Sequence, residues 1–330
     1  MASSVSVIVV NYNGRELIGA CLEGLSVQDE RPDEIVVVDN GSSDGSVDFV
    51  RERFPEVRVV ALATNRGFAG GNNAGVSATH GARLAFLNND AVPDPHWLRR
   101  LSAALDAHPW AAMATSRVVY QDDPGVVDSA GDGLSRWGGA FKRFHGQPVA
   151  LAQATQEVFG ACGAAFMIER DVFAEVDGFD EDFFLSHEDV DLSYRVQLSG
   201  RGCVYVADAV VTHAVSATLG RISATAVFHG QRNLEWLYIK NTPWPLVLRT
   251  LPGHVVYALA SGVYHAYVGH AGPFLRGKAA AVKGLPRMLT KRRRIQRVRR
   301  SSSERLWNLM DRGWLGIKWR EKRFDVGVRT

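Results

Sequence analysis

Carboxylate side chains are concentrated in one short segment of this 330-residue chain. Glu188, Asp189 and Asp191 lie close together where the sequence predicts that a helix begins. The helix dipole favours acidic side chains in a first turn, so helix capping is one explanation of the pattern. Like charges held close together also raise a carboxyl pKa, which suits a general base that must deprotonate a hydroxyl group near neutral pH. The segment is therefore a candidate for general-base catalysis.

Two more carboxylates and one histidine each follow a run of apolar residues. Asp39 ends the run EIVVVD and can accept hydrogen bonds from a ligand or hold the following turn. Asp90 ends the cluster NND at 88–90, whose oxygen atoms suit a divalent cation such as Mg²⁺ or an Asx turn. His213 ends the run VVTH and can ligate a metal, contact phosphate oxygens or serve as a structural residue.

The elements that must position these side chains form an α/β pattern. The β-branched runs at 5–10 and 34–39 enclose a stretch, residues 15–27, with helical spacing of apolar residues. Strands at 57–62 and 83–87 and helices at 67–80 and 94–107 continue the alternation. Ligands bind at the carboxyl ends of the strands in such parallel sheets, so the polar residues after each run are expected to converge. Beyond residue 228 the chain is expected to be helical.

The overall composition is that of a globular protein. Hydrophobic residues make up 46% and charged residues 22% of the chain, which excludes disorder, collagen and a coiled coil as overall descriptions. The three cysteines lie far apart, so neither a disulfide framework nor a zinc site is indicated. The first residues lack the basic and apolar segments of a signal peptide, and we expect a cytoplasmic location.

Charge is unevenly distributed along the chain. Residues 291–330 hold 14 Lys and Arg against 4 Asp and Glu, although the net charge of the whole chain is only +3. Residues 285–300 have the spacing of a basic amphipathic helix, which together with Trp244, Trp307, Trp314 and Trp319 predicts peripheral attachment to an anionic membrane, at the inner face of the plasma membrane. The alternative is a solvated basic helix with tryptophans in the core.

Two other features bear on the partners of this chain. Residues 250–275 carry no Asp, Glu, Lys or Arg, but their glycines, prolines and histidines make a poor membrane span, so a buried or in-plane helix is expected. No recognised nucleic-acid module accompanies the basic tail, so no nucleic-acid partner is expected.

The order of the motifs resembles that of the family 2 glycosyltransferases, in particular their rhamnosyltransferase-like bacterial members. The segments that carry the resemblance are VSVIVVNYN, VVVDNGSSDGS, NRGFAGGNNAG, FLNNDAVPDP, FGACGAAFMIERDVFAEVDGFDEDFF, HEDVDLSYR and VVTH. They span residues 4–215, with a weaker match at 232–243. The resemblance implies a GT-A fold, with a Rossmann-like, mostly parallel sheet flanked by helices. It divides the chain into a catalytic domain over 1–228 and a helical, basic region over 229–330.

The resemblance also implies a reaction and a role for each motif residue. A sugar would pass with inversion from a nucleoside diphosphate donor to a hydroxyl of a glycan or polyprenyl-diphosphate-linked acceptor. Asp189 matches the catalytic base with Glu188 beside it, and Asp191 supports the acceptor side or the helix start. Asp90 and His213 match the residues that hold Mn²⁺ or Mg²⁺, although NND supplies one carboxylate where many relatives have two. The expected donor-binding residues are Asn11, Tyr12, Asn13, Asp39, Asn65, Arg66, Gly67, Asn72 and Asn89.

The resemblance leaves the donor open. It favours dTDP-L-rhamnose, while UDP- and GDP-sugars remain alternatives. A catalytically silent glycan-binding or scaffold protein on the same fold is the competing interpretation, and loss of Asp90 or Asp189 would be its mark. Both residues are present. A nucleotidyltransferase would require a Gly-rich basic loop after the first strand, and NYNGRELIG has no such loop.

Overall fold

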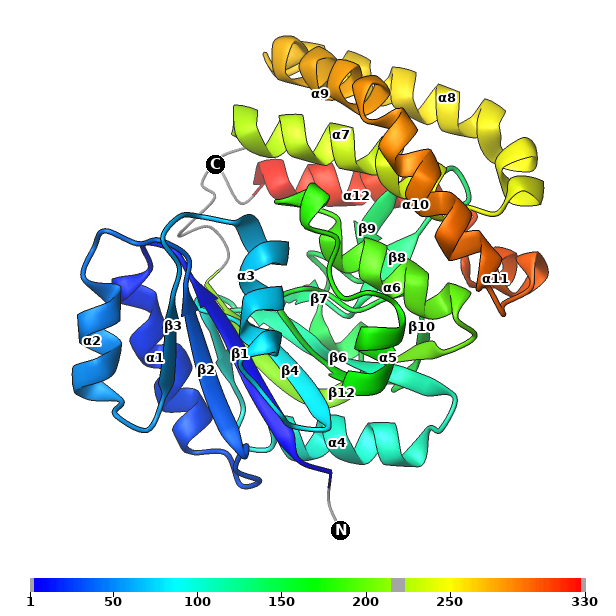
Figure 1. Cartoon of the computed structure of the whole chain (residues 1–330). Coiled ribbons are helices and arrows are strands. Elements are labelled where there is room, and N and C mark those ends of the chain that lie inside the picture. Colours follow the sequence, from blue (N-terminus) through cyan, green and yellow to red (C-terminus); the bar gives the residue numbers. More distant parts are fainter. Residues whose placement is uncertain (1–2, 215–222, 328–330) are drawn as a thin grey trace.

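The computed structural model describes residues 3–214 and 223–327, and Figure 1 shows the arrangement of its elements. The strands are β1 (Val5–Asn11), β2 (Glu34–Asp39), β3 (Arg58–Ala61), β4 (Arg83–Asn88), β5 (Ala91–Pro93), β6 (Ala111–Tyr120), β7 (Val127–Ser129), β8 (Asp132–Leu134), β9 (Ala140–Lys142), β10 (Gln156–Val158), β11 (Ala165–Glu169) and β12 (Gly202–His213). The helices are α1 (Arg15–Ser26), α2 (Ser46–Arg53), α3 (Gly67–Ser77), α4 (Trp97–Ala107), α5 (Arg170–Glu175), α6 (Glu188–Leu198), α7 (Ala224–Asn241), α8 (Trp244–Tyr267), α9 (Ala271–Lys283), α10 (Leu285–Arg297), α11 (Ser303–Leu309) and α12 (Trp314–Gly327).

The main sheet has the strand order β10-β12-β6-β11-β4-β1-β2-β3. Strand β1 pairs in parallel with β2 and β4, and β12 pairs in parallel with β6, whereas β11 runs antiparallel between β4 and β6. The expectation of an α/β fold with a mostly parallel sheet is therefore confirmed. In the register of the sheet Asn11 lies opposite Asp39 and Val10 lies opposite Asn88, so the polar strand ends meet at one edge.

The apolar runs form the central strands because both of their faces are covered. Val7 and Val9 of β1 point into a core cluster with α1 and α4, while Ile8 points into a second cluster that includes residues of α3, α5 and α6. Successive side chains of a strand alternate between faces, so a continuous run of Val and Ile fills both layers. This packing fixes the sheet and the positions of its polar ends.

The helices after residue 223 pack onto the sheet domain through a third core. Phe183, Tyr194 and Leu198 of the sheet domain are buried with Trp236 of α7 and Met288 of α10. Figure 1 shows this helical region beyond the edge where β1 and β2 end, with α8 and α9 as its outer layer. Among the described helices, α8 alone is long and apolar enough to cross a membrane by length and composition, and little of it is buried.

Candidate active site

Asp39 lies in a buried polar cluster at the carboxyl ends of β1, β2 and β4. One of its carboxylate oxygens accepts a hydrogen bond from the Ser42 backbone at 2.9 Å, and the Asn11 amide lies 3.5 Å from the other. The Asn11 side-chain oxygen in turn accepts a hydrogen bond from the Asn89 amide at 2.8 Å. A carboxylate can accept about four hydrogen bonds, so these two contacts leave Asp39 able to bind a ligand. The structure thus brings three of the predicted donor-binding residues together.

Tyr12 and Asn13 form the turn that leaves this cluster. The Tyr12 side chain is exposed beside it, and Asn13 adopts a left-handed backbone conformation with φ of 49°. The Asn13 backbone donates a hydrogen bond to the Ser42 hydroxyl at 2.9 Å, and its side chain accepts one from the Ser43 backbone at 2.9 Å. These contacts tie the turn after β1 to the turn after β2, so both predicted residues border the Asp39 cluster.

The third predicted turn, residues 65–67, is tied to the second through Asn40. The Asn40 amide donates to the Asn65 side chain at 3.0 Å, and its oxygen accepts from the Arg66 backbone at 2.9 Å. Gly67 has a φ of 72°, and a Cβ there would clash with the Phe184 carbonyl, so this turn requires glycine. The Arg66 guanidinium is exposed and pairs with Glu181 at 2.9 Å.

Asn72 lies apart from these three turns. It is buried inside α3, and its amide donates to the Phe68 carbonyl one helical turn earlier at 3.0 Å. The helix itself therefore accounts for this side chain.

Asp90 and His213 lie side by side, as the paired strands β5 and β12 require. His213 is opposite Ala91 in the register of the sheet, and its Nε2 lies 3.0 Å from the Asp90 carboxylate. Its Nδ1 lies 3.1 Å from Asp128, a fully buried carboxylate that also pairs with Lys142 at 2.7 Å. Burial opposes a charge on the imidazole, but the hydrogen bonds to Asp128 and Asp90 outweigh it and raise the pKa of His213 to about 9. Asp128 and Lys142 have no counterpart in the sequence prediction.

The chemistry of this pair fits a divalent cation. A carboxylate that fixes Nδ1 of a histidine turns Nε2 toward a metal, and Asp128 stands in that position behind His213. Within residues 3–214 and 223–327, no group of three or more His, Cys, Asp or Glu side chains converges on one point. A cation such as Mn²⁺ or Mg²⁺ would thus be held by Asp90 and His213, with a diphosphate and water supplying the other ligands.

Asp189 stands next to the 88–90 cluster, at the N-terminus of α6. Its Oδ2 accepts a hydrogen bond from the Gly163 backbone at 2.8 Å, and the next residue, Ala164, accepts one from the Asn88 backbone at 2.9 Å. This backbone bridge joins the predicted base to the predicted metal-binding strand end. Burial raises the pKa of Asp189, although its backbone hydrogen bonds oppose the shift.

A second carboxyl group, Asp132, is in hydrogen-bonding contact with the Asp189 side chain. Asp132 is buried, and its pKa is raised well above the usual value, first by burial and then by the charge of Asp189. Two carboxyl groups in contact cannot both be ionised at low cost, so the pair favours a state in which it shares one proton. No sequence signal pointed to this partner, because Asp132 lies in a Gly- and Asp-rich stretch that predicts loops or a short hairpin.

Glu188 is buried beside Asp189. Burial and the neighbouring Asp189 raise its pKa to about 8. Its Oε2 has no hydrogen-bond partner in the described part of the chain. A buried and unpaired carboxyl oxygen is costly, which is typical of a group that meets a ligand.

The turn before Glu188 and Asp189 has a strained backbone and is held by hydrogen bonds from α7. Phe184, Ser186 and His187 all have positive φ, between 51° and 70°, although none is glycine. The buried Asn233 amide donates to the carbonyls of Phe183, Leu185 and Ser186 at 2.7, 2.9 and 2.7 Å. Such strain persists only when surrounding contacts impose it. Asn233 is therefore a positioning residue for the start of α6.

Asp191 points away from these residues, toward α7. Its carboxylate pairs with Arg195 at 2.8 Å and with Lys240 at 2.7 Å, and it accepts a hydrogen bond from Asn241 at 2.7 Å. All of these side chains are buried. These contacts explain Asp191 as a buried ion pair between α6 and α7, without any acceptor.

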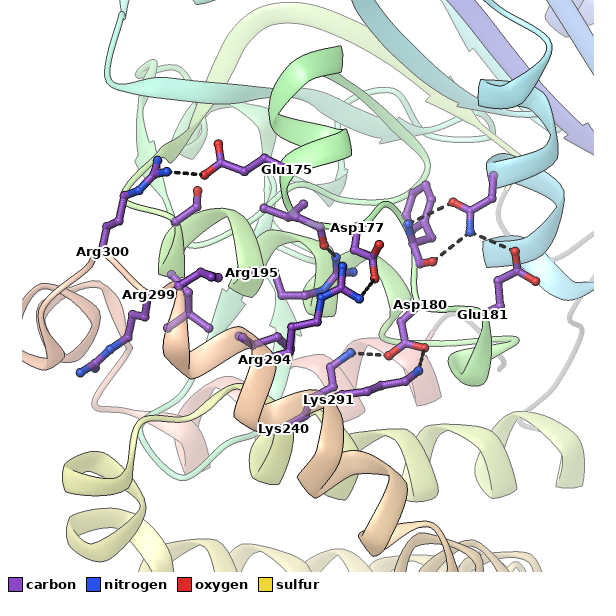
Figure 2. A pocket seen from close by; sticks show the side chains of 17 residues that line it. Glu175, Asp177, Asp180, Glu181, Arg195, Lys240, Lys291, Arg294, Arg299 and Arg300 are labelled. Atoms are coloured by element: carbon purple, nitrogen blue, oxygen red, sulfur yellow. Dashed lines mark hydrogen bonds and ion pairs between the residues drawn. The ribbon is translucent and has the colours of Figure 1, made fainter.

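A separate cavity of about 520 Å³ lies between α10 and the sheet domain, and Figure 2 shows its lining. None of the predicted site residues lines it. Ion pairs cross it: Arg294 of α10 pairs with Asp177 at 3.1 Å, and Arg300, which follows α10, pairs with Glu175 at 2.9 Å. These ion pairs link α10 and the residues after it to the sheet domain.

Comparisons with known proteins agree with this geometry. The family model described as Glycosyl transferase family 2 matches residues 6–177, more than half of the chain. An N-acetylglucosaminyl-diphospho-decaprenol L-rhamnosyltransferase of Mycobacterium tuberculosis is 26% identical over 285 residues, which cover 72% of this chain and 87% of the relative.

Two solved structures share the fold at low sequence identity. A mannosyltransferase from Pyrobaculum calidifontis in complex with GDP-Man and Mn²⁺ has a TM-score of 0.54 and 19% identity, over 90% of this chain and 84% of its own. GalNAc-T7 with UDP, GalNAc and Mn²⁺ has a TM-score of 0.57 and 15% identity, over 72% of this chain. The present chain spans only half of the latter structure.

Proposed function

Because the chain belongs to glycosyl transferase family 2, we propose that it moves L-rhamnose from dTDP-L-rhamnose to a hydroxyl of a polyprenyl-diphosphate-linked glycan. Its fold is the GT-A fold, as expected from the motif order, and it is a glycosyltransferase of cell-surface polysaccharide synthesis. The choice of sugar and acceptor rests on the mycobacterial relative, whose name specifies rhamnose and a decaprenol-linked N-acetylglucosamine.

One observation carries the reaction. The candidate base Asp189, the candidate metal-binding pair Asp90 and His213, and the polar cluster around Asp39 lie at one sheet edge. Asp189 is joined to the 88–90 cluster through the Gly163–Ala164 backbone, and Asn89 of that cluster contacts Asn11 beside Asp39. A donor lying along this edge would place its base near Asp39 and its diphosphate near Asp90, with the anomeric carbon facing Asp189.

The reaction follows from the position of the base. Asp189 takes the proton of the acceptor hydroxyl, and that oxygen attacks the anomeric carbon from the side opposite the diphosphate. The C–O bond to the diphosphate breaks, the nucleoside diphosphate leaves with the electron pair, and the configuration at the carbon inverts. A divalent cation held by Asp90 and His213 would neutralise the charge of the diphosphate. The pKa of Asp132 is raised well above its usual value by burial and by the charge of Asp189, so a proton held on Asp132 would leave Asp189 free to act as the base.

A panel of nucleotide sugars tests the donor side of this proposal. A ligand that binds only the folded state stabilises it by mass action, and its melting temperature rises. At a ligand concentration of 100 times Kd, the free energy of unfolding increases by about 2.7 kcal/mol. We expect dTDP-L-rhamnose to raise the melting temperature with Mn²⁺ or Mg²⁺, and to do so more than UDP- or GDP-sugars. A larger shift with a UDP- or GDP-sugar would replace the donor in this proposal, and no shift with any donor would favour a silent scaffold.

A further inference from the structure

The exposed side of α8 is an uninterrupted apolar stripe. Its residues recur at helical spacing, and they are Trp244, Leu248, Leu251, Val255, Leu259, Val263 and Tyr267. Leu248 is 75% exposed, Leu259 66% and Val263 72%. On the neighbouring helix α9, Leu275 and Val282 are exposed as well. Isolated exposed apolar residues are ordinary, but a contiguous apolar face of this length is typical of an interaction surface.

The opposite side of α8 is fixed to the protein. His254 is buried, and its ring lies 2.9 Å from the Glu235 carboxylate and 2.8 Å from the Trp137 carbonyl. Tyr257 is also buried, against Gly139. These contacts would have to break for α8 to cross a bilayer. The helix is therefore suited to lie in the plane of a membrane surface, which is one of the two placements expected for the uncharged stretch at 250–275.

The sequence that forms the stripe and the helices after it carries charge of one sign. Residues 236–303 contain 13 Lys and Arg and no Asp or Glu. On α9 and α10, the side chains of Arg276, Lys283 and Arg287 are exposed, and Arg287 also pairs with Asp182. A basic border around an apolar face matches the headgroup and acyl regions of an anionic bilayer. A second copy of this chain matches poorly, because a two-fold interface would bring the same cations against one another.

We propose that α8 and α9 form the face by which this protein lies on a membrane rich in anionic phospholipid. The apolar residues of α8 enter the acyl boundary, and the cations of α9 and α10 contact the headgroups. This placement differs from the one predicted from sequence, which embedded residues 285–300. Met288 of α10 is buried in the core, and Lys291 pairs with Asp180 and Asp182, so α10 cannot turn its apolar side to a bilayer.

The tryptophans divide in the same way. Trp307 lies between Arg136 and Arg249, whose guanidinium carbons are 3.9 and 3.7 Å from its ring centre, so it is held within the protein. Trp244 is exposed at the start of α8, and Arg292 lies over its ring. Trp319 of α12 is exposed, and the Trp314 side chain lies outside the described residues. Trp244 thus borders the proposed face, whereas Trp307 does not.

The inference deepens the proposed function and rests on it in one respect, the lipid-linked acceptor. In Figure 1 the helical region lies beyond the sheet edge where β1 and β2 end, which is the edge that carries the site. A protein resting on α8 and α9 would therefore keep that edge toward the membrane side, where a polyprenyl-diphosphate acceptor is anchored.

Vesicle flotation of the full chain tests the face without any turnover. We expect binding to vesicles that contain phosphatidylglycerol, little binding to pure phosphatidylcholine, and a loss at high salt. The double change Leu259→Asp and Val263→Asp should weaken binding about tenfold or more, because two apolar side chains no longer enter the boundary. Arg276→Gln with Lys283→Gln should weaken binding to the anionic vesicles alone. Leu151→Asp, at an apolar residue that is 58% exposed on the sheet domain, is the matched control.

Three results would overturn the inference. The first is equal flotation of the α8 double variant and the Leu151 control. The second is a wild-type dimer in light scattering that the α8 double variant converts to a monomer, with flotation unchanged, since the stripe would then be a contact between copies. The third is a wild-type protein that does not float but still transfers sugar to a detergent-solubilised acceptor, which would refute this inference and leave the proposed function intact.

Discussion

Replacing Asn233 should separate catalysis from donor binding. Its amide holds three carbonyls of the turn at 183–187, and three residues of that turn have positive φ. Asn233→Ala leaves the Leu185 and Ser186 carbonyls without this donor, while Arg232 still donates to the Phe183 carbonyl at 3.3 Å. The loss of two hydrogen bonds should lower the free energy of unfolding by about 2–4 kcal/mol. The strain in the turn then relaxes, and the carboxylates at the start of α6 move. A displacement of about 1 Å in reacting groups lowers the rate about 100-fold.

The assay is steady-state transfer together with urea unfolding. We expect kcat of Asn233→Ala to fall by about 10- to 100-fold. The KM for the donor should change less than kcat, because Asp39 lies on β2, whereas the turn meets the 65–67 segment through Phe184, whose carbonyl accepts a hydrogen bond from the Phe68 backbone at 2.9 Å. Gln231→Ala, two residues away on α7 and without a contact to the turn, is the matched control. A variant that loses stability but keeps the wild-type kcat would refute the positioning role of Asn233.

The remaining predictions concern Glu188 and the candidate metal-binding residues Asp90 and His213. Glu188 has a pKa of about 8 in the folded protein against 4.5 in the unfolded chain, so the folded state holds this proton more tightly and loses relative stability as pH rises toward 8. Glu188→Gln removes that loss and should raise the free energy of unfolding, measured with urea, by about 2–5 kcal/mol at pH 9 but not at pH 4. If wild type and variant showed the same dependence of stability on pH, the assigned burial of Glu188 would be wrong. Asp90→Asn and His213→Ala should each abolish the additional melting shift that Mn²⁺ gives to the donor, and a full shift in both variants would place the cation elsewhere.

The sheet and its polar edge could be predicted from the sequence because their signals are local. The β-branched runs at 5–10 and 34–39 end in Asn11 and Asp39, and the parallel register brings these ends together. The antiparallel strand β11, which separates β4 from β6, could not be predicted in this way. Its place depends on pairing between residues far apart in sequence, which periodicity does not encode.

The partners of the site residues escaped prediction for the same reason. Asp128 and Asp132 lie in a Gly-rich stretch, and only the folded chain brings them to His213 and Asp189. The resemblance implied that Asp191 supports the acceptor side or the helix start, and only the folded chain shows that its carboxylate pairs with Lys240 at 2.7 Å. A charge pattern in a sequence does not reveal which carboxylates are paired.

The amphipathic pattern at 285–300 was likewise ambiguous. Its apolar spacing is real, but Met288 packs into the core of the protein rather than outward. The exposed stripe lies on α8, where the sequence shows only a lack of charge. A helix that packs on the rest of the protein and a helix that lies on a membrane both need an apolar face at helical spacing. Only the structure distinguishes the two cases.

The central claim is that Asp189 deprotonates the acceptor during glycosyl transfer. Its most direct test is mass spectrometry of the product from dTDP-L-rhamnose and polyprenyl-diphosphate-linked N-acetylglucosamine, in single turnover, with wild-type protein and Asp189→Asn. We predict an acceptor heavier by one rhamnose for the wild type. Asp189→Asn should give no product in the same time, although dTDP-L-rhamnose shifts its melting temperature as it does for the wild type. Product from Asp189→Asn at the wild-type rate would contradict the claim.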